Sequence, residues 1–345
     1  MLTTGCQTAP SGNSPSAPEN PLTEITSHSA TVQKLIDEAR ALEPLATSEL
    51  TKRFLHATAT LPAIAPRTVL RNDQTREYFS AAKAAVLPEA QRARLVPVEL
   101  DEYRYYYTKY GSPLAYMRAL DLAAANGLGD VSGKRILDYG YGSIGHLRLL
   151  ASLGAHVTGV DVDSYLDALY SQPEDNGPVK GRLFHSGSVT LVNGSYPKDT
   201  TTKNRVGQGF DLIVSKNTLK RGYIKPERKV EKRLLVDLGV SEGVFLKTLF
   251  DALKPGGKLI IYNLYPKQAD AKEAYKPMAD GRSPFSQSQF EQAGFRVIAI
   301  DANDDAAARR IGHVLGWEKN EKGEIVDDLE KNLFALYSIV ERPVR

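Results

Sequence analysis

The stretch ILDYGYGSIGH, residues 136–146, places three glycines, Gly140, Gly142 and Gly145, directly after a short apolar segment. Their spacing is the G-x-G-x-x-G pattern of a nucleotide-binding turn between a strand and a helix. Glycines at such a turn let the backbone approach a bound nucleotide closely. Because the pattern alone is a weak signal, the surrounding segments must decide which nucleotide the turn fits.

Strand-like and helix-like segments alternate on both sides of this turn. A helix is expected at 146–154, and another at 244–257 with Leu246, Leu249, Phe250 and Leu253 on one face. Short apolar strands are expected at 134–140, 155–163, 189–195, 210–217, 257–264, 294–301 and 333–342. The alternation predicts an α/β fold with a doubly wound, mostly parallel sheet that helices cover on both faces.

The chain before the turn has a different character. Residues 1–25 are rich in Ser and Pro, which is typical of a disordered tether. Residues 26–129 are expected to form a helical N-terminal extension and lid, with helices at 29–43, 76–87 and 111–127. In the last of these, Ser112 is the expected N-cap and Gly127 follows the end. Residues 130–345 form the predicted core.

The single cysteine, Cys6, lies in LTTGCQTAP, residues 2–10. This segment resembles the end of a bacterial lipoprotein signal, although no basic and apolar region precedes it in the sequence. Two interpretations stay open. Cys6 is an incidental residue in the tail of a cytoplasmic protein, or the native start lies upstream and the protein is exported and lipid-anchored. An in-frame stop close before Met1 would exclude the second.

Composition excludes several classes of function. The chain has 345 residues, 44 Lys and Arg against 41 Asp and Glu, and a net charge of +3, which argues against a dedicated nucleic-acid binder. No apolar run approaches the roughly 18 residues of a membrane helix. The 6 histidines show no metal-ligand spacing, so no metal site is expected.

Two acidic residues help to identify the nucleotide. Asp138 lies two residues before the first glycine, where a carboxylate would repel the pyrophosphate of NAD and would attract a cationic amino group. Asp161 ends the second strand and can accept hydrogen bonds from both hydroxyls of a ribose, which NAD and S-adenosylmethionine share. Asp138 therefore favours S-adenosylmethionine, and an NAD-dependent oxidoreductase is the weaker alternative.

Three segments, 136–163, 210–219 and 249–264, resemble the class I S-adenosylmethionine-dependent methyltransferases in order and spacing. The resemblance covers roughly residues 130–345. It implies a seven-stranded sheet whose last strand is antiparallel, S-adenosylmethionine as the cofactor, and methyl transfer as the activity. A protein of the cell envelope with this fold and no catalytic activity is the main alternative.

The resemblance also implies roles for single residues in holding the cofactor. Asp138 would meet the amino group of its methionine end, Gly140 and Gly142 would allow close backbone approach, and Asp161 would hold the ribose hydroxyls. Ser195 stands where the family often has an acid that contacts adenine, and a serine hydrogen bond there is weaker. The family's third glycine is replaced by Ile144, with Gly145 following it.

An aromatic-rich segment precedes the predicted core, with five tyrosines between positions 103 and 110. Many methyltransferases of this class place such a segment over the methionine end of the cofactor. Tyr107 and Tyr110 are therefore the expected lid residues. Packing of the segment on the sheet and base stacking are the alternative interpretations.

The methyl acceptor is expected beyond the fourth strand, where Lys216, Asn217 and Tyr223 are the candidate catalytic residues. Lys216 and Asn217 could instead cap the strand end. The stretch lacks the Asn/Asp-Pro-Pro-aromatic motif of enzymes that methylate amide or adenine nitrogens, so a small-molecule or lipid-like acceptor is expected. Seven basic residues between 220 and 233 indicate either a solvated surface or contact with an anionic acceptor or a phospholipid surface.

Overall fold

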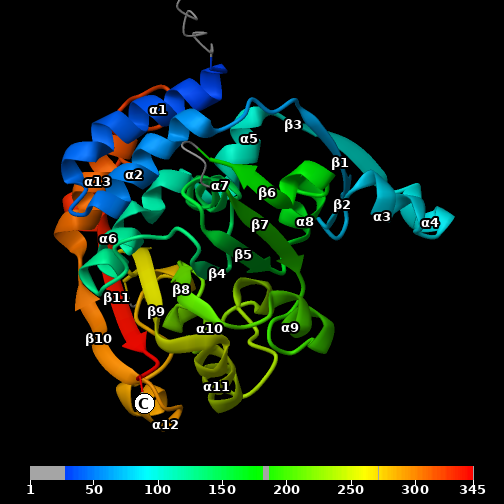
Figure 1. Ribbon diagram of the computed structural model, residues 1–345. Coiled ribbons are helices and arrows are strands. Elements are labelled where there is room, and N and C mark those ends of the chain that lie inside the picture. Colours follow the sequence, from blue (N-terminus) through cyan, green and yellow to red (C-terminus); the bar gives the residue numbers. More distant parts are fainter. Residues whose placement is uncertain (1–27, 182–185, 271, 345) are drawn as a thin grey trace, which may run out of the picture.

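The computed structural model describes residues 28–181, 186–270 and 272–344 of the chain. Eight strands form its central sheet, in the order β10, β11, β9, β8, β4, β5, β7, β6 (Figure 1). Their bounds are β4 Arg135–Tyr139, β5 His156–Asp161, β6 Gly177–Lys180, β7 Ser186–Asn193, β8 Phe210–Lys216, β9 Leu253–Pro266, β10 Arg296–Asn303 and β11 Leu333–Glu341.

The strand directions confirm the predicted doubly wound sheet. Strands β7, β5, β4, β8 and β9 pair in parallel, and β11 runs antiparallel to both β9 and β10. All seven expected strands are present. The eighth, β6, adds to the edge of β7 in antiparallel orientation; its GPVK sequence is too short to have been predicted.

The chain leaves β4 toward β5 on one side and returns to β8 on the other. In an open α/β sheet this reversal of strand order leaves a crevice at the carboxyl ends of the strands, where ligands bind. The glycine turn follows β4, so it lies at that crevice.

Alternate residues of each central strand face two separate cores. Ile136, Leu212 and Ile260 belong to one cluster, which includes buried residues of the helices α1 (Ala30–Leu42), α6 (Met117–Ala125), α7 (Gly145–Ser152) and α13 (Asp305–Leu315). Leu137, Ile213 and Ile261 belong to the other, which includes residues of α9 (Thr200–Val206), α11 (Glu242–Ala252) and α12 (Gln287–Gln292). This switch from one residue to the next is the period of a strand buried on both faces.

The helices that cover the sheet are short. In the core they are α7 Gly145–Ser152, α8 Ser164–Leu169, α9 Thr200–Val206, α10 Arg221–Ile224, α11 Glu242–Ala252, α12 Gln287–Gln292, α13 Asp305–Leu315 and α14 Leu329–Asn332, with 3₁₀ turns η5 Pro173–Asp175, η6 Lys232–Leu234 and η7 Pro277–Ala279. None of the helices in the described ranges has the length and apolar composition that a bilayer span requires.

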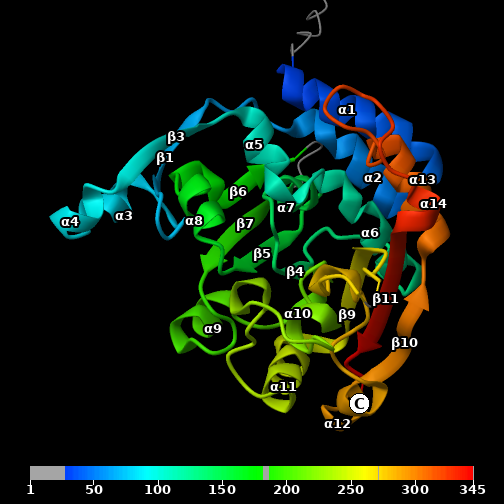
Figure 2. The same ribbon diagram turned by 180° about the vertical axis from the view of Figure 1, so that it is seen from behind.

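The N-terminal extension contains the expected helices in part. Its helical elements are α1 Ala30–Leu42, η1 Glu43–Leu45, α2 Glu49–His56, η2 Ala57–Thr60, α5 Glu102–Tyr106, η3 Thr108–Tyr110, η4 Pro113–Tyr116 and α6 Met117–Ala125. The Ser112 hydroxyl caps η4, which confirms the expected N-cap, and Ser29 caps α1. Helices α1, α2 and α13 lie side by side (Figure 2).

The middle of the extension corrects the prediction of a helical region. Strands β1 Arg67–Asn72, β2 Tyr78–Phe79 and β3 Leu95–Leu100 form a separate antiparallel sheet in the order β2, β1, β3. The helix expected at 76–87 is replaced by β2 and the short α3 Ala81–Ala85, with α4 Glu89–Arg92 after it. Pro97 lies on β3, an edge strand, where a missing backbone N–H is tolerated.

The predicted tether, residues 1–25, and Cys6 lie outside the described residues. Their interpretation as a lipoprotein tail therefore stays a prediction.

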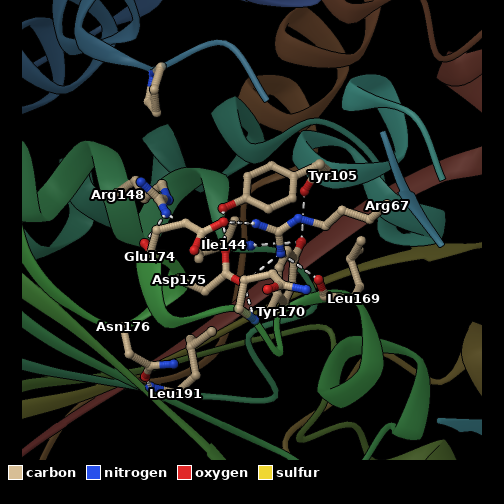
Figure 3. A network of polar contacts seen from close by, with 12 residues as sticks. Arg67, Tyr105, Ile144, Arg148, Leu169, Tyr170, Glu174, Asp175, Asn176 and Leu191 are labelled. Atoms are coloured by element: carbon tan, nitrogen blue, oxygen red, sulfur yellow. Dashed lines mark hydrogen bonds and ion pairs between the residues drawn. The ribbon is translucent and has the colours of Figure 1, made fainter. Parts of the chain in front are cut away.

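A buried polar network joins the extension to the core (Figure 3). The Asp175 carboxylate, at the end of η5, is fully buried and accepts hydrogen bonds from Arg67 of β1 at 2.5 Å and from the Tyr105 hydroxyl of α5 at 2.7 Å. Arg148 of α7 lies 3.8 Å away. The Tyr170 hydroxyl then donates to the Tyr105 carbonyl at 2.7 Å, so side chains of both parts share one network.

Replacing Asp175 with Asn should destabilise the whole protein. The change removes the buried countercharge of the nearly buried Arg67 guanidinium and leaves it only the exposed Glu174 carboxylate at 3.3 Å; breaking a buried ion pair typically costs about 3–5 kcal/mol of unfolding free energy. Urea unfolding would measure this. Asp73→Asn is the matched control, since Asp73 pairs with Arg71 at the surface and its loss should change stability by less than about 1 kcal/mol. Equal effects of the two changes would contradict a central role for the network.

Candidate functional site

A cavity of about 940 Å³ opens at the carboxyl ends of β4, β5, β7 and β8. The sequence predicted that residues from three segments far apart in the chain would lie together at this edge of the sheet. The lining includes the predicted residues Tyr110, Gly140, Gly142, Asp161, Ser195, Lys216, Asn217 and Tyr223. Asp138 and Tyr107 do not line it.

A side chain at the first glycine of the turn would overlap its neighbours, and one at the second would be tightly crowded. Gly140 has φ 79°, its N–H donates to the Val160 carbonyl at 2.8 Å, and a Cβ there would overlap the Thr218 side chain. Gly142 has φ 61°, and a Cβ there would lie 3.2 Å from the Tyr110 ring. Glycine alone adopts such angles without strain, so the turn keeps bare backbone at the cavity wall.

The third glycine of the turn, Gly145, has a packing role. Gly145 begins α7, and a Cβ there would lie 2.8 Å from the Pro113 side chain. This glycine allows the extension to pack closely on α7. Gly145 therefore matches the G-x-G-x-x-G pattern because it packs against the N-terminal extension, and not because it lines the cavity.

Asp161 ends β5 and presents one of its two oxygens to the cavity. Its Oδ1 accepts hydrogen bonds from the backbone N–H groups of Val162 and Asp163, at 2.8 and 3.0 Å. Its Oδ2 accepts only a long 3.4 Å bond from the Gly142 N–H. Burial raises the pKa of Asp161 to about 6. The carboxylate is thus held rigidly, with Oδ2 available to a hydroxyl donor.

Residues 108–110 fasten the extension over the glycine turn. The Thr108 hydroxyl donates to the Gly142 carbonyl at 2.9 Å. The Tyr110 hydroxyl donates to Asp163 at 2.6 Å, and the Lys109 ammonium lies 2.7 Å from the same carboxylate. Tyr110 therefore lies at the rim where a lid residue was expected.

Tyr107 lies elsewhere. Its ring stacks on Tyr103 at 4.4 Å between centroids, and the Lys34 ammonium of α1 lies 5.0 Å from its centroid. It is buried between α5 and α1 rather than exposed to the cavity. The structure therefore brings one of the two expected lid tyrosines to the cavity.

Asp138 is buried behind the cavity wall. Its Oδ2 lies 2.5 Å from Nε2 of His146, while its Oδ1 has no hydrogen-bond partner among the described residues. Burial lowers the pKa of His146, so the imidazole is neutral near pH 7 and donates its Nε2 proton to the carboxylate. The Tyr116 ring stacks on His146 at 3.5 Å and separates this pair from the cavity that Tyr116 lines.

At the end of β8, Asn217 has a structural role, whereas Lys216 and the nearby Tyr223 contribute polar groups to the cavity wall. Asn217, at φ 64°, donates its N–H to the Tyr262 carbonyl at 3.0 Å and accepts from the Leu264 N–H at 2.8 Å through Oδ1. These bonds hold the ends of β8 and β9 together, which agrees with the expected alternative of a strand cap. Lys216 and Tyr223 are half-buried at the wall.

Ser195, two residues beyond β7, is half-buried and lines the cavity between Gly194 and Tyr196. Its carbonyl accepts a hydrogen bond from the Asp199 N–H at 2.8 Å. The residue thus lies on the β7 side of the cavity, where the resemblance implies contact with adenine.

Several lining residues were not predicted from the sequence. Tyr116 and Lys220 reach the cavity from segments that were expected to be a helix and a surface basic run. Asp163 was visible as a carboxylate two residues after Asp161, but its role in holding the rim depends on Lys109 and Tyr110. No group of three or more metal-binding side chains forms within the described parts of the chain.

Comparisons with known proteins give a consistent but distant likeness. No family model matches the chain, and no curated protein matches it. Among solved structures, it is similar to the [4+2]-cyclase SpnF, at 18% identity over 66% of this chain and 81% of that chain, with a TM-score of 0.39.

Two other similar structures are named as methyltransferases. An S-adenosylmethionine-dependent methyltransferase from Mesorhizobium loti has 18% identity, covering 66% of this chain and 98% of that chain, with a TM-score of 0.38. A Haemonchus contortus phosphoethanolamine N-methyltransferase, solved with phosphomonomethylethanolamine and S-adenosylhomocysteine, has 14% identity, covering 86% and 76%, with a TM-score of 0.40.

Gly140→Ala should lower stability more than Gly133→Ala. Both residues have positive φ, 79° and 69°, so each change costs roughly 1–2 kcal/mol of backbone strain. A Cβ at Gly133 meets nothing within 4 Å, whereas one at Gly140 overlaps Thr218. We expect a further cost of about 1–3 kcal/mol at Gly140, measured by urea unfolding. Equal losses would show that the turn tolerates a side chain.

Proposed function

We propose that this protein transfers a methyl group from S-adenosylmethionine to a small-molecule or lipid-like acceptor. One observation supports this most strongly: Asp161, whose Oδ2 accepts only a long hydrogen bond, lines a cavity that bare glycine backbone also lines. A carboxylate at the end of the second parallel strand, beside a glycine turn, suits a ribose attached to a nucleoside.

The residues present fit such a cofactor at three points. The overlap that a Cβ would cause at Gly140 shows a turn built from backbone alone. Asp161 offers Oδ2 to the ribose hydroxyls, and Ser195 lies on the β7 side, where its hydroxyl can bond to an adenine amine. Tyr110 closes the rim above the turn through its bond to Asp163.

Asp138 has a changed role in this proposal. Because His146 occupies its Oδ2 and the Tyr116 ring lies in front, the residue supplies negative charge from behind the wall. That charge favours a cationic amino group at the adjoining end of the cavity. Tyr107 takes no part in cofactor binding here.

The cofactor supplies an electrophilic methyl group on a sulfonium. The protein's own task is to align the acceptor and exclude water, because alignment provides much of the rate of such a displacement. Lys216 and Tyr223 are the proposed acceptor-facing groups, and Asn217 positions them by holding the ends of β8 and β9. Burial raises the pKa of Tyr223, so its hydroxyl stays protonated and can donate a hydrogen bond.

Thermal unfolding with separate ligands tests the proposal. A ligand at about a hundred times its Kd stabilises the folded state by roughly 2.7 kcal/mol. For a chain of this size the midpoint should rise by roughly 5–10 °C. We expect this shift with S-adenosylmethionine and S-adenosylhomocysteine and none with NAD. A shift with NAD alone would favour an oxidoreductase, and none with any ligand would favour a non-catalytic protein.

Asp161→Asn should weaken binding of S-adenosylhomocysteine by roughly 10- to 100-fold, because a charge-assisted hydrogen bond contributes about 1.5–3 kcal/mol. Titration calorimetry at pH 7.5 would measure it. Asp167→Asn is the control, since Asp167 pairs with Lys83 outside the cavity lining and its loss should leave the affinity unchanged.

The pH dependence of the same binding provides a second check on Asp161. Because burial raises its pKa to about 6, the carboxyl becomes protonated below that pH and can no longer accept two hydroxyls. The affinity of the wild-type protein should be constant above about pH 7 and fall toward tenfold per unit below pH 6. A flat profile from pH 5 to 8 would contradict the assignment, and the Asn variant should give that flat profile.

A further inference from the structure

Two lysines from the β8–α10 region line the cavity, and one of them is almost fully buried. Lys216 ends β8, and Lys220 precedes α10 with 4% of its surface exposed. The Lys220 ammonium donates to the carbonyls of Leu264, at 2.5 Å, and Met278, at 3.5 Å. Neutral carbonyls fix its position but do not neutralise its charge.

Neither ammonium group has a carboxylate within ion-pair distance among the described residues. Each instead lies over a tyrosine ring that also lines the cavity. The distance from Nζ to the centroid is 5.4 Å for Lys216 and Tyr116, and 5.5 Å for Lys220 and Tyr223. The attraction between a cation and an aromatic ring offsets only part of the hydration free energy that a buried charge loses.

The neighbouring basic residues contrast with these two. In the run from 220 to 233, Arg221 lies 3.8 Å from Asp280, Lys225 lies 2.6 Å from Glu242, and Arg233 lies 2.5 Å from Glu231. Those three cations are balanced by carboxylates. Lys220 differs from them because it is almost fully buried and has no carboxylate within ion-pair distance among the described residues.

The electrostatics of the two lysines agree with this geometry. Burial lowers the pKa of Lys216 to about 8, and the charge of Asp138 opposes that shift. Burial, together with the charge of Lys216, lowers the pKa of Lys220 to about 7. Two adjacent cations in a cavity wall are stable when an anion lies between them.

The other charged groups around the cavity do not supply that anion. Asp163 is already paired with Lys109, and Asp161 is bonded to backbone N–H groups. Asp138 is bonded to His146 behind the Tyr116 ring. The remaining charged lining residues are Asp237, which is exposed and accepts a hydrogen bond from the Gly239 N–H at 2.7 Å, and Arg233, which is paired with Glu231.

We propose that Lys216 and Lys220 bind an anionic group of the methyl acceptor, a carboxylate or a phosphate ester. The inference rests on the proposed methyl transfer and assigns the acceptor to organic acids or phosphorylated small molecules. Lys220 is the main anchor, because none of the carboxylates in the described ranges lies within ion-pair distance of it. The anion keeps both lysines protonated, so they orient the acceptor and do not act as its base.

Sulfate is a suitable probe because it carries two negative charges and does not titrate near neutral pH. Calorimetric titration of the full chain should show saturable sulfate binding at pH 7.5. Lys220→Gln and Lys216→Gln should each weaken it at least about tenfold, since each removes a charge-assisted hydrogen bond. Lys225→Gln is the matched control, because Lys225 is paired with Glu242 and should leave sulfate binding unchanged.

Proton uptake gives a readout that surface lysines would not produce. At pH 8, sulfate binding should draw roughly one proton from solution, because the anion raises both lowered lysine pKa values. Calorimetry in buffers of different ionisation enthalpy measures this number. Absence of sulfate binding, binding without proton uptake, or an equal loss in Lys225→Gln would each overturn the proposal.

A second pair of ligands distinguishes the acceptor's anion from the cofactor's own carboxylate. S-adenosylhomocysteine carries that carboxylate, and 5′-methylthioadenosine lacks it. We expect the Lys220→Gln variant to bind both with wild-type affinity, which also shows that it is folded. A selective loss for S-adenosylhomocysteine would overturn the proposal by assigning the lysines to the cofactor. If the wild-type protein binds sulfate but not S-adenosylhomocysteine, the proposed function fails while the anion site stands.

Discussion

The close contact between bare backbone and side chains at the glycine turn is the constraint on which the site depends. Thr218 presses on Gly140, Tyr110 on Gly142, and Pro113 on Gly145. These three residues come from the β8 end and from the extension, so a turn of a few residues fixes both walls of the cavity. Because these side chains pack directly on the glycine backbone, a small displacement of the turn would move both walls of the cavity together.

Much of the core could be predicted because its signals are local. Each strand is a short apolar run, and the order of strands follows from their alternation with helices. The position of Asp161 and the first two glycines at one cavity could be predicted because they directly follow strands that meet at one edge. The extension was harder to predict. The residues of β1 to β3 mix charged and apolar types without a clear period, and β1 and β2 contact α8, which is distant in the sequence.

The direction of single side chains was the least predictable property. Tyr107 and Tyr110 lie three positions apart, yet the first packs on α1 and the second reaches the cavity. Lys220 belongs to a basic run in which Arg221, Lys225 and Arg233 pair with carboxylates, and nothing in the run marks it as buried. Such differences arise from tertiary packing, and a single sequence contains no direct record of that packing.

The network around Asp175 has a consequence for cooperativity. From Arg67 and Tyr105 it continues through the Tyr170 hydroxyl, which accepts a hydrogen bond from the Ile144 N–H at 3.2 Å. Ile144 immediately precedes α7, so the extension is bonded to the very segment that shapes the nucleotide turn. The two parts on either side of residue 129 are thus joined by buried hydrogen bonds. We therefore expect them to unfold as one cooperative unit, so that melting of the extension would also remove the structure of the turn.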